Sequence, residues 1–143
     1  MLKKEIMKKI LVLCTGNSCR SQMAEGYLRF FADGKAEIYS AGIIAHGVNP
    51  RAIQSMKEDG IDISVHTSNK VDDYLAIDFD FVITVCDNAN ELCPIFPSKA
   101  KKFHQNFYDP SWHIGSEEEI TASFNSVRNE IKAYCHNFVS ENL

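Results

Sequence analysis

The sequence predicts an α/β fold with three layers, α/β/α, in which helices cover both faces of a parallel sheet of about four strands. Short apolar runs rich in Ile, Leu and Val alternate along the chain with longer segments of helical periodicity. Parallel strands need crossover connections, and the intervening helices supply them. The 143 residues suffice for one continuous core, so we expect a single domain spanning 1–143.

The first half of the chain contains two strand–helix units. Lys8–Cys14 is short, branched and apolar, as buried strands are. A helix is expected from about Ser21, where apolar residues recur at helical spacing until Asp33 and Gly34 end it. Residues 36–41 predict a second strand. The next helix is expected after Asn49, an N-cap residue that is followed by a proline at the first helical position.

The second half continues the alternation. A short helix or turn is expected at 68–75, a buried strand at 80–86 and a helix at 88–93 that Pro94 ends. Residues 101–107 predict the last strand. An apolar stripe with three glutamates at its start predicts a long final helix over 117–139.

Composition narrows the function classes. Hydrophobic residues make up 45% of the chain and the net charge is −4, which is typical of a soluble globular protein and argues against nucleic-acid binding. The longest apolar run is far too short to cross a membrane, and the N-terminus lacks a signal-peptide pattern, so we expect a cytoplasmic protein. Met7 is an alternative start, which would make residues 1–6 a loose leader.

Five cysteines in a chain without an export signal make a disulfide framework improbable and favour metal or redox chemistry. They are Cys14, Cys19, Cys86, Cys93 and Cys135. No C-x-x-C or H-x-x-x-H spacing occurs, so we predict reactive thiols and no metal site.

The loop after the first strand has the features of an oxyanion cradle. Backbone amides and a helix N-terminus converge on an anion at such a loop, and Arg20 can grip two of its oxygens. The same positive field favours the thiolate form of Cys14, which would be the nucleophile. Asn17 tolerates the left-handed backbone that the loop needs. The predicted cradle comprises Thr15, Gly16, Asn17, Ser18, Cys19, Arg20 and Ser21.

Asp109 follows the last predicted strand and therefore lies at the same edge of the sheet as Cys14. There it could act as a general acid that protonates the leaving oxygen. The alternative interpretation is a turn aspartate before Pro110, which its local sequence favours.

Cys86 and Cys93 flank a segment of weak helix propensity. In a regular helix their Cα atoms would be about 10.5 Å apart, whereas a disulfide needs roughly 4.4 to 6.8 Å. We predict a redox switch in which oxidation joins Cys86 to Cys93 and loosens the segment. Two inert buried thiols are the alternative.

Together these motifs resemble the thioredoxin-coupled arsenate reductases, which share the fold of the low-molecular-weight protein tyrosine phosphatases. The resemblance rests on "LCTGNSCRSQMAEG", "YSAGIIAHGVNP", "TVCDNANELCP" and "YDP" and covers most of the chain from Met7. It implies that Cys14 attacks arsenate, that Arg20 binds the oxyanion and that Asp109 assists protonation. Cys86 and then Cys93 would resolve the adduct and leave a disulfide for thioredoxin.

The resemblance also bears on cofactors. No bound cofactor is implied beyond thioredoxin as electron donor, but some family members bind potassium beside the cradle. The matching positions are Asn17, Glu25, Thr67 and Asn69. The last is usually aspartate in the family, and its replacement by asparagine argues against the cation.

Two other functions use the same cradle. A tyrosine phosphatase would hydrolyse a Cys14 phosphocysteine with Asp109 as acid and base, but it has no need for Cys86 and Cys93. A phosphocysteine carrier of sugar transport would need neither Arg20 nor Asp109. Cys19 is expected to be a loop or packing thiol, or an off-pathway disulfide partner of Cys14.

Overall fold

The computed structural model describes residues 7–87 and 91–143. The expected leader 1–6 and half of the predicted helix 88–93 therefore lie outside the described residues. The other half, Glu91–Cys93, is not helical, which corrects that prediction. None of the helices within the described ranges is long and apolar enough to cross a membrane.

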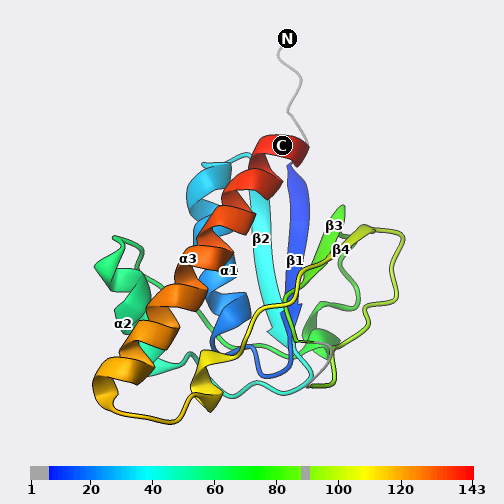
Figure 1. The fold of residues 1–143 in the computed structure, drawn as a ribbon. Helices are drawn as coiled ribbons and strands as arrows, with labels where there is room; N and C mark the ends of the chain where they lie inside the picture. The colour runs from blue at the N-terminus through cyan, green and yellow to red at the C-terminus, as the bar shows by residue number, and fades with distance from the viewer. Residues whose placement is uncertain (1–6, 88–90) are drawn as a thin grey trace.

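The described residues form a four-stranded parallel sheet in the order β2-β1-β3-β4 (Figure 1). Its strands are β1 Lys8–Cys14, β2 Ala36–Gly42, β3 Phe81–Thr84 and β4 Lys101–His104. This confirms the predicted parallel α/β sheet. Because β1 pairs with both β2 and β3, the carboxyl end of β1 lies at the middle of one sheet edge, where ligands of such folds bind.

Three α-helices pack on one face of the sheet: α1 Arg20–Ala32, α2 Pro50–Glu58 and α3 Glu117–Asn142. Helices α1 and α3 lie side by side on it (Figure 1). The opposite face is covered by the short 3₁₀ helix η1, Val71–Tyr74, and by loops. The predicted second helical layer is therefore a single 3₁₀ turn with loops, because η1 is only four residues long.

Strand lengths differ from the expectation at the second half of the sheet. The predicted strand 80–86 is Phe81–Thr84, and the predicted strand 101–107 is Lys101–His104. Both strands are short because β3 and β4 pair only over four residues, from Phe81 with Lys101 to Thr84 with His104. Cys86 lies two residues beyond the end of β3, at the carboxyl edge of the sheet.

Helix ends follow their capping residues. The Asn49 side chain accepts a hydrogen bond of 2.8 Å from the N–H of Arg51, and Pro50 takes the first position of α2, as predicted. Ser116 and Glu119 form a capping box at the start of α3. Asp33, in the left-handed conformation, ends α1.

Asp59 joins the three helices through its carboxylate. It accepts a hydrogen bond of 2.7 Å from the Tyr27 hydroxyl of α1 and lies 2.9 Å from the ammonium group of Lys132 in α3. The hydrogen bond from Tyr27, followed by that from Lys132, lowers the pKa of Asp59 from its ordinary value of 3.8.

We expect Asp59→Asn to reduce the free energy of unfolding by about 1 kcal/mol near neutral pH. A carboxylate whose pKa is lowered in the folded state stabilises the fold above its unfolded pKa, and that contribution is lost as pH falls through the folded pKa. The difference between the variant and the wild type should therefore shrink as pH is lowered below about 3.8. Urea unfolding of both proteins at neutral and at acidic pH measures this difference in the free energy of unfolding. An equal difference at the two pH values would contradict a stabilising role for the Asp59 carboxylate.

Candidate active site

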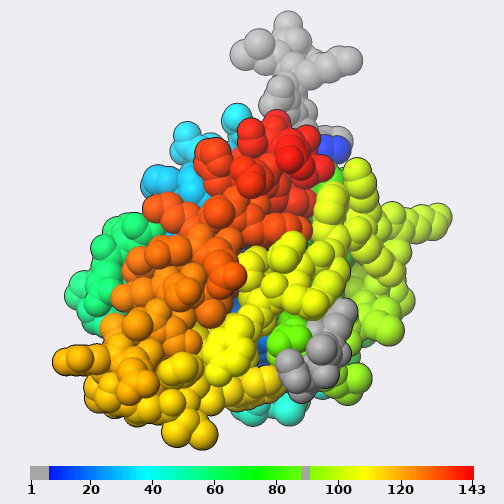
Figure 2. Space-filling view, in the orientation of Figure 1, coloured from blue at the N-terminus to red at the C-terminus, as the bar shows by residue number. Residues whose placement is uncertain are grey.

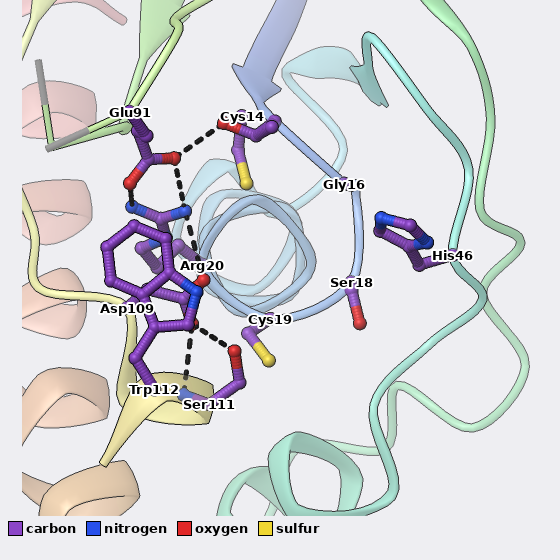
Figure 3. Close-up of a pocket in the computed structure, with 11 residues that line it drawn as sticks. Cys14, Gly16, Ser18, Cys19, Arg20, His46, Glu91, Asp109, Ser111 and Trp112 are labelled. Carbon is purple, nitrogen blue, oxygen red and sulfur yellow. Dashed lines mark hydrogen bonds and ion pairs between the residues drawn. The ribbon is translucent and has the colours of Figure 1, made fainter.

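A cavity of about 330 Å³ opens at the carboxyl end of β1, where the chain turns into α1. Figure 2 shows the yellow connection between β4 and α3 covering this end of the molecule, with blue N-terminal atoms visible in the hollow beside it. The lining residues come from four segments of the chain, drawn in Figure 3. They are Cys14, Thr15, Gly16, Ser18, Cys19, Arg20, His46, Glu91, Asp109, Ser111 and Trp112.

The loop from β1 to α1 is held from outside by the segment 44–49. The carbonyl groups of Thr15, Gly16 and Ser18 accept backbone hydrogen bonds of 3.0 to 3.1 Å from this segment. The next N–H in each trans peptide points the opposite way, away from the segment. Cys19, the N-cap of α1, makes no side-chain capping bond. The loop therefore keeps amide donors for a ligand, as a cradle requires.

Gly42 at the end of β2 lets the loop approach the sheet. A Cβ atom there would lie 2.6 Å from the carbonyl oxygen of Thr15 and 2.8 Å from the amide nitrogen of Asn17. Both are backbone atoms, so a side chain at this position would displace the cradle. The close approach explains why the strand beside the cradle ends in glycine.

Asn17 fixes the loop from within. It has the left-handed backbone conformation that the sequence predicted, with φ 47°, and it is fully buried. Its amide nitrogen donates hydrogen bonds of 2.8 and 2.9 Å to the hydroxyls of Ser21 and Ser40, and its amide oxygen accepts one of 2.8 Å from the N–H of Asn69. A fully bonded buried asparagine makes the cradle rigid.

The residues that match potassium ligands in the family do not fit a cation here. The Glu25 carboxylate accepts a hydrogen bond of 2.6 Å from Ser40 and pairs with Arg29 at 2.9 Å. The amide nitrogen of Asn69 donates to both oxygens of Thr67, at 3.0 and 3.2 Å. Oxygens of Glu25, Asn17 and Thr67 thus already accept hydrogen bonds from N–H and O–H donors. Across 7–87 and 91–143, no group of three or more His, Cys, Asp and Glu side chains is placed to hold a metal ion.

Arg20 is the charged centre of the cavity, and its side chain is only 2% exposed. Its two terminal nitrogens each donate a hydrogen bond of 2.6 Å to the carboxylate of Glu91. One of them also donates to the carbonyl of Phe107 at 3.2 Å. The Nε of Arg20 is buried without a hydrogen-bond partner among the described residues. A buried donor that is left over in this way points to a ligand of the cavity.

Burial by itself lowers the pKa of Arg20, but the hydrogen bond to Glu91 and the nearby Cys14 and Asp109 raise it overall. Arg20 is therefore a permanent cation facing a thiol and two carboxyl groups. Its fork can hold two oxygens of a tetrahedral oxyanion, which a lysine could not do.

Glu91 is the functional residue that sequence reasoning missed. Besides Arg20, its carboxylate accepts a hydrogen bond of 2.5 Å from the hydroxyl of Thr15 and one of 3.2 Å from the N–H of Asp87. Burial raises its pKa, but the hydrogen bonds from Arg20 and Thr15 outweigh this and lower it. No local signal marks Glu91 as part of the site, because Arg20 and Thr15, its partners in the cavity, lie more than 70 residues away.

Asp109 caps a turn with one carboxyl oxygen and faces the cavity with the other. One carboxyl oxygen caps the 3₁₀ turn Pro110–Trp112 by accepting hydrogen bonds from the N–H and hydroxyl of Ser111, at 3.0 and 2.7 Å. The other lies 3.4 Å from a terminal nitrogen of Arg20 and lines the cavity. The turn therefore aims one oxygen of Asp109 at the place where Arg20 would hold an oxyanion (Figure 3).

The cysteines fall into three groups. Cys86 and Cys93 form a disulfide with their Cα atoms 5.7 Å apart, which is the pairing predicted from the sequence. Cys14 is free, and the sulfur of Cys86 lies 3.9 Å from the carbonyl oxygen of Leu13, beside Cys14. Cys19 and Cys135 are free and buried.

Burial, followed by the charges of Asp109 and Cys14, raises the pKa of Cys19 to about 12, so this thiol stays neutral at physiological pH. Burial likewise raises the pKa of Cys135, which packs between α3 and α1. Burial thus disfavours, in both thiols, the thiolate form that a nucleophile needs.

A loop of this form between a parallel strand and a helix, with a cysteine and an arginine at its ends, defines a class of oxyanion-binding enzymes. The model of the low molecular weight phosphotyrosine protein phosphatase family matches residues 9–143, and the chain belongs to this family. Within the family it is 50% identical over 124 residues to the arsenate reductase of Halalkalibacterium halodurans, which covers 87% of this chain and 89% of that protein.

Solved structures agree with this placement. An arsenate reductase in the phosphate binding state matches with a TM-score of 0.79 at 36% identity, and an arsenate reductase in the oxidized state matches with a TM-score of 0.79 at 33% identity. Each match covers 94% of this chain and 98% of that chain. The resemblance predicted from the sequence motifs is confirmed.

Proposed function

We propose that this protein reduces arsenate to arsenite through a thiol–disulfide cascade in which Cys14, Cys86 and Cys93 act in turn. One observation carries the proposal: Cys86 is bonded to Cys93 while Cys14 is a free thiol at the mouth of the oxyanion cradle. This is the state in which such a cascade ends. Relatives that carry the name arsenate reductase support the choice of substrate.

The first step forms a bond between the sulfur of Cys14 and the arsenic of arsenate. Arg20 and the loop amides hold the arsenate oxygens and stabilise the charge that develops on them. An arsenic–oxygen bond breaks, and Asp109 donates the proton with which that oxygen leaves as water. The product is a covalent adduct on Cys14 in which arsenic is still pentavalent.

The second step transfers two electrons to arsenic. The thiolate of Cys86 attacks the sulfur of Cys14, a disulfide forms between them, and the sulfur–arsenic bond breaks with its electron pair remaining on arsenic, which leaves as arsenite. The thiolate of Cys93 then attacks Cys86 and releases Cys14 as a thiolate. The oxidation has moved from the cradle to the Cys86–Cys93 disulfide.

The third step returns the disulfide to thiols at the expense of a protein dithiol, which we propose is thioredoxin. Cys86 is fully buried and Cys93 is partly exposed, so the incoming thiolate is expected to attack the sulfur of Cys93. Leu92 and Ile95, which flank it, are 76% and 84% exposed and offer an apolar contact to the reductant. Such a cycle requires a reducing compartment, which supports a cytoplasmic location.

Hydrolysis of phosphate monoesters is a second activity that the site supports. Phosphate has the shape and charge of arsenate, and Asp109 is placed to protonate a leaving alcohol. The exposed ring of Trp112 lines the cavity and can contact an aryl group. We propose this as a side reaction, because hydrolysis makes no use of Cys86 and Cys93.

A single-turnover experiment tests the cascade with the wild-type protein. Fully reduced protein mixed with excess arsenate and no other reductant should release about one arsenite per chain. Peptide mapping by mass spectrometry should then find Cys86 bonded to Cys93 and Cys14 free to be alkylated. Release of no arsenite, or a final disulfide that contains Cys14, would contradict the proposed order of thiols. Phosphate in place of arsenate is the control and should leave all three thiols reduced.

A further inference from the structure

Glu91 occupies the position on Arg20 that the proposed function assigns to the oxyanion. Its two carboxylate oxygens each accept a hydrogen bond of 2.6 Å from a different terminal nitrogen of Arg20 (Figure 3). The hydroxyl of Thr15, the first residue of the cradle, donates to the same carboxylate. Two oxygens in one plane match one edge of a tetrahedral oxyanion. The carboxylate is therefore an internal mimic of the ligand.

The pair is almost fully withdrawn from water, since the side chain of Glu91 is 5% exposed and that of Arg20 is 2% exposed. An arsenate or phosphate ion that binds the fork must displace Glu91 and leave its carboxylate without the cation. Separating one partner from a buried ion pair is strongly unfavourable. Glu91 and the oxyanion are thus competitors for one cation.

The disulfide lies close to Glu91 along the chain. Glu91 is two residues before Cys93, whose bond to Cys86 holds the two Cα atoms 5.7 Å apart. The N–H of Glu91 donates to the carbonyl of Asp87 at 3.0 Å, and the N–H of Asp87 donates to the Glu91 carboxylate at 3.2 Å. Glu91 is thus tied to Asp87 by two hydrogen bonds and lies two residues from the disulfide at Cys93. Reduction removes the covalent tie, and a regular helix would move the cysteines to about 10.5 Å apart.

We propose that Glu91 is a redox-dependent competitor of the oxyanion, which occupies the Arg20 fork when Cys86 is bonded to Cys93 and leaves it when the disulfide is reduced. The proposal rests on the assignment of Arg20 as the oxyanion-binding residue. In the oxidised protein Cys86 cannot resolve an adduct on Cys14, so a bound oxyanion would occupy the cradle without reacting. Glu91 excludes it until the thiols are restored.

The coupling must be reciprocal. If the disulfide weakens oxyanion binding by some factor, the oxyanion must favour the reduced form over the oxidised form by the same factor. Arrival of substrate and reduction of the disulfide would then support each other. Glu91 is the residue through which each would act on the other.

Titration with inorganic phosphate tests the proposal, because phosphate binds without oxidising the thiols. Its Kd is measured calorimetrically for reduced protein and for protein with the Cys86–Cys93 disulfide, verified by mass spectrometry. We expect wild-type protein to bind phosphate about tenfold or more weakly when oxidised. In Glu91→Gln the oxidised form should bind phosphate nearly as tightly as the reduced form does. The Kd of the reduced form should change by less than about twofold.

Glu117→Gln is the matched control, because Glu117 makes a comparable two-bond pair with Arg51, at 2.7 Å, on the surface. It should keep the wild-type difference between the redox forms. Equal phosphate affinity of oxidised wild type and oxidised Glu91→Gln would overturn the proposal, and so would an equal gain in both redox forms. If reduced wild-type protein binds no phosphate, the assignment of Arg20 falls as well, so the two failures are distinguishable.

Discussion

Replacing Cys93 with serine should stop arsenate reduction after about one turnover, while hydrolysis of an aryl phosphate stays within about twofold of the wild type. The cradle, Cys14 and Cys86 remain, so arsenite is released once and a Cys14–Cys86 disulfide forms. Without a thiol at position 93, nothing in the cascade frees Cys14. Arsenate-dependent NADPH consumption, coupled through thioredoxin and its reductase, measures turnover, and mass spectrometry identifies the trapped disulfide.

Cys14→Ser should abolish both activities, because a serine hydroxyl is not ionised at neutral pH, is a far weaker nucleophile than a thiolate and cannot form the disulfide with Cys86. Comparison of Cys14→Ser with Cys93→Ser distinguishes the thiol needed for both activities from a thiol needed only for repeated arsenate reduction. Cys135→Ser is the control, since this buried thiol packs between α3 and α1 and takes no part in the relay. Continued turnover by Cys93→Ser at the wild-type rate would exclude the three-thiol cascade.

Much of the fold follows from local patterns in the sequence. The apolar run Ile10–Leu13 predicts a strand buried on both faces, and each residue of it is fully buried in the structure. The capping residues Asn49 and Ser116 set the starts of α2 and α3. These features are encoded by neighbours in the chain, and for that reason they are visible without a structure.

The candidate site was predictable to the extent that its residues follow strand ends. Cys14 ends one strand of the parallel sheet and Asp109 follows another, which brings them to one edge. Glu91 has no such marker, because it follows no strand end and its contact with Arg20 joins residues 71 positions apart in the chain. The extent of β3 and β4 and the 3₁₀ layer over the second face likewise depend on which segments meet, and local propensity does not encode this.

Arg20→Lys should lower kcat/KM for arsenate by about a hundredfold or more, with a comparable loss for an aryl phosphate. A lysine keeps a positive charge in the cavity but replaces the planar fork with a single ammonium group. It cannot hold two oxygens of the transition state while also satisfying the Phe107 carbonyl and the oxygen of Asp109 that Arg20 faces. In both reactions Arg20 stabilises negative charge on the oxygens of the bound substrate, so both values of kcat/KM should fall.

The matched control is Arg51→Lys, which makes the same chemical change in an arginine–carboxylate pair on the surface. It should leave kcat/KM close to the wild-type value. Thermal unfolding of both variants separates loss of chemistry from loss of fold, because burial of a differently shaped cation at position 20 also perturbs the core. If folded Arg20→Lys retained wild-type kcat/KM, the bidentate grip would have no part in catalysis, and the cradle amides would have to supply the oxyanion binding alone.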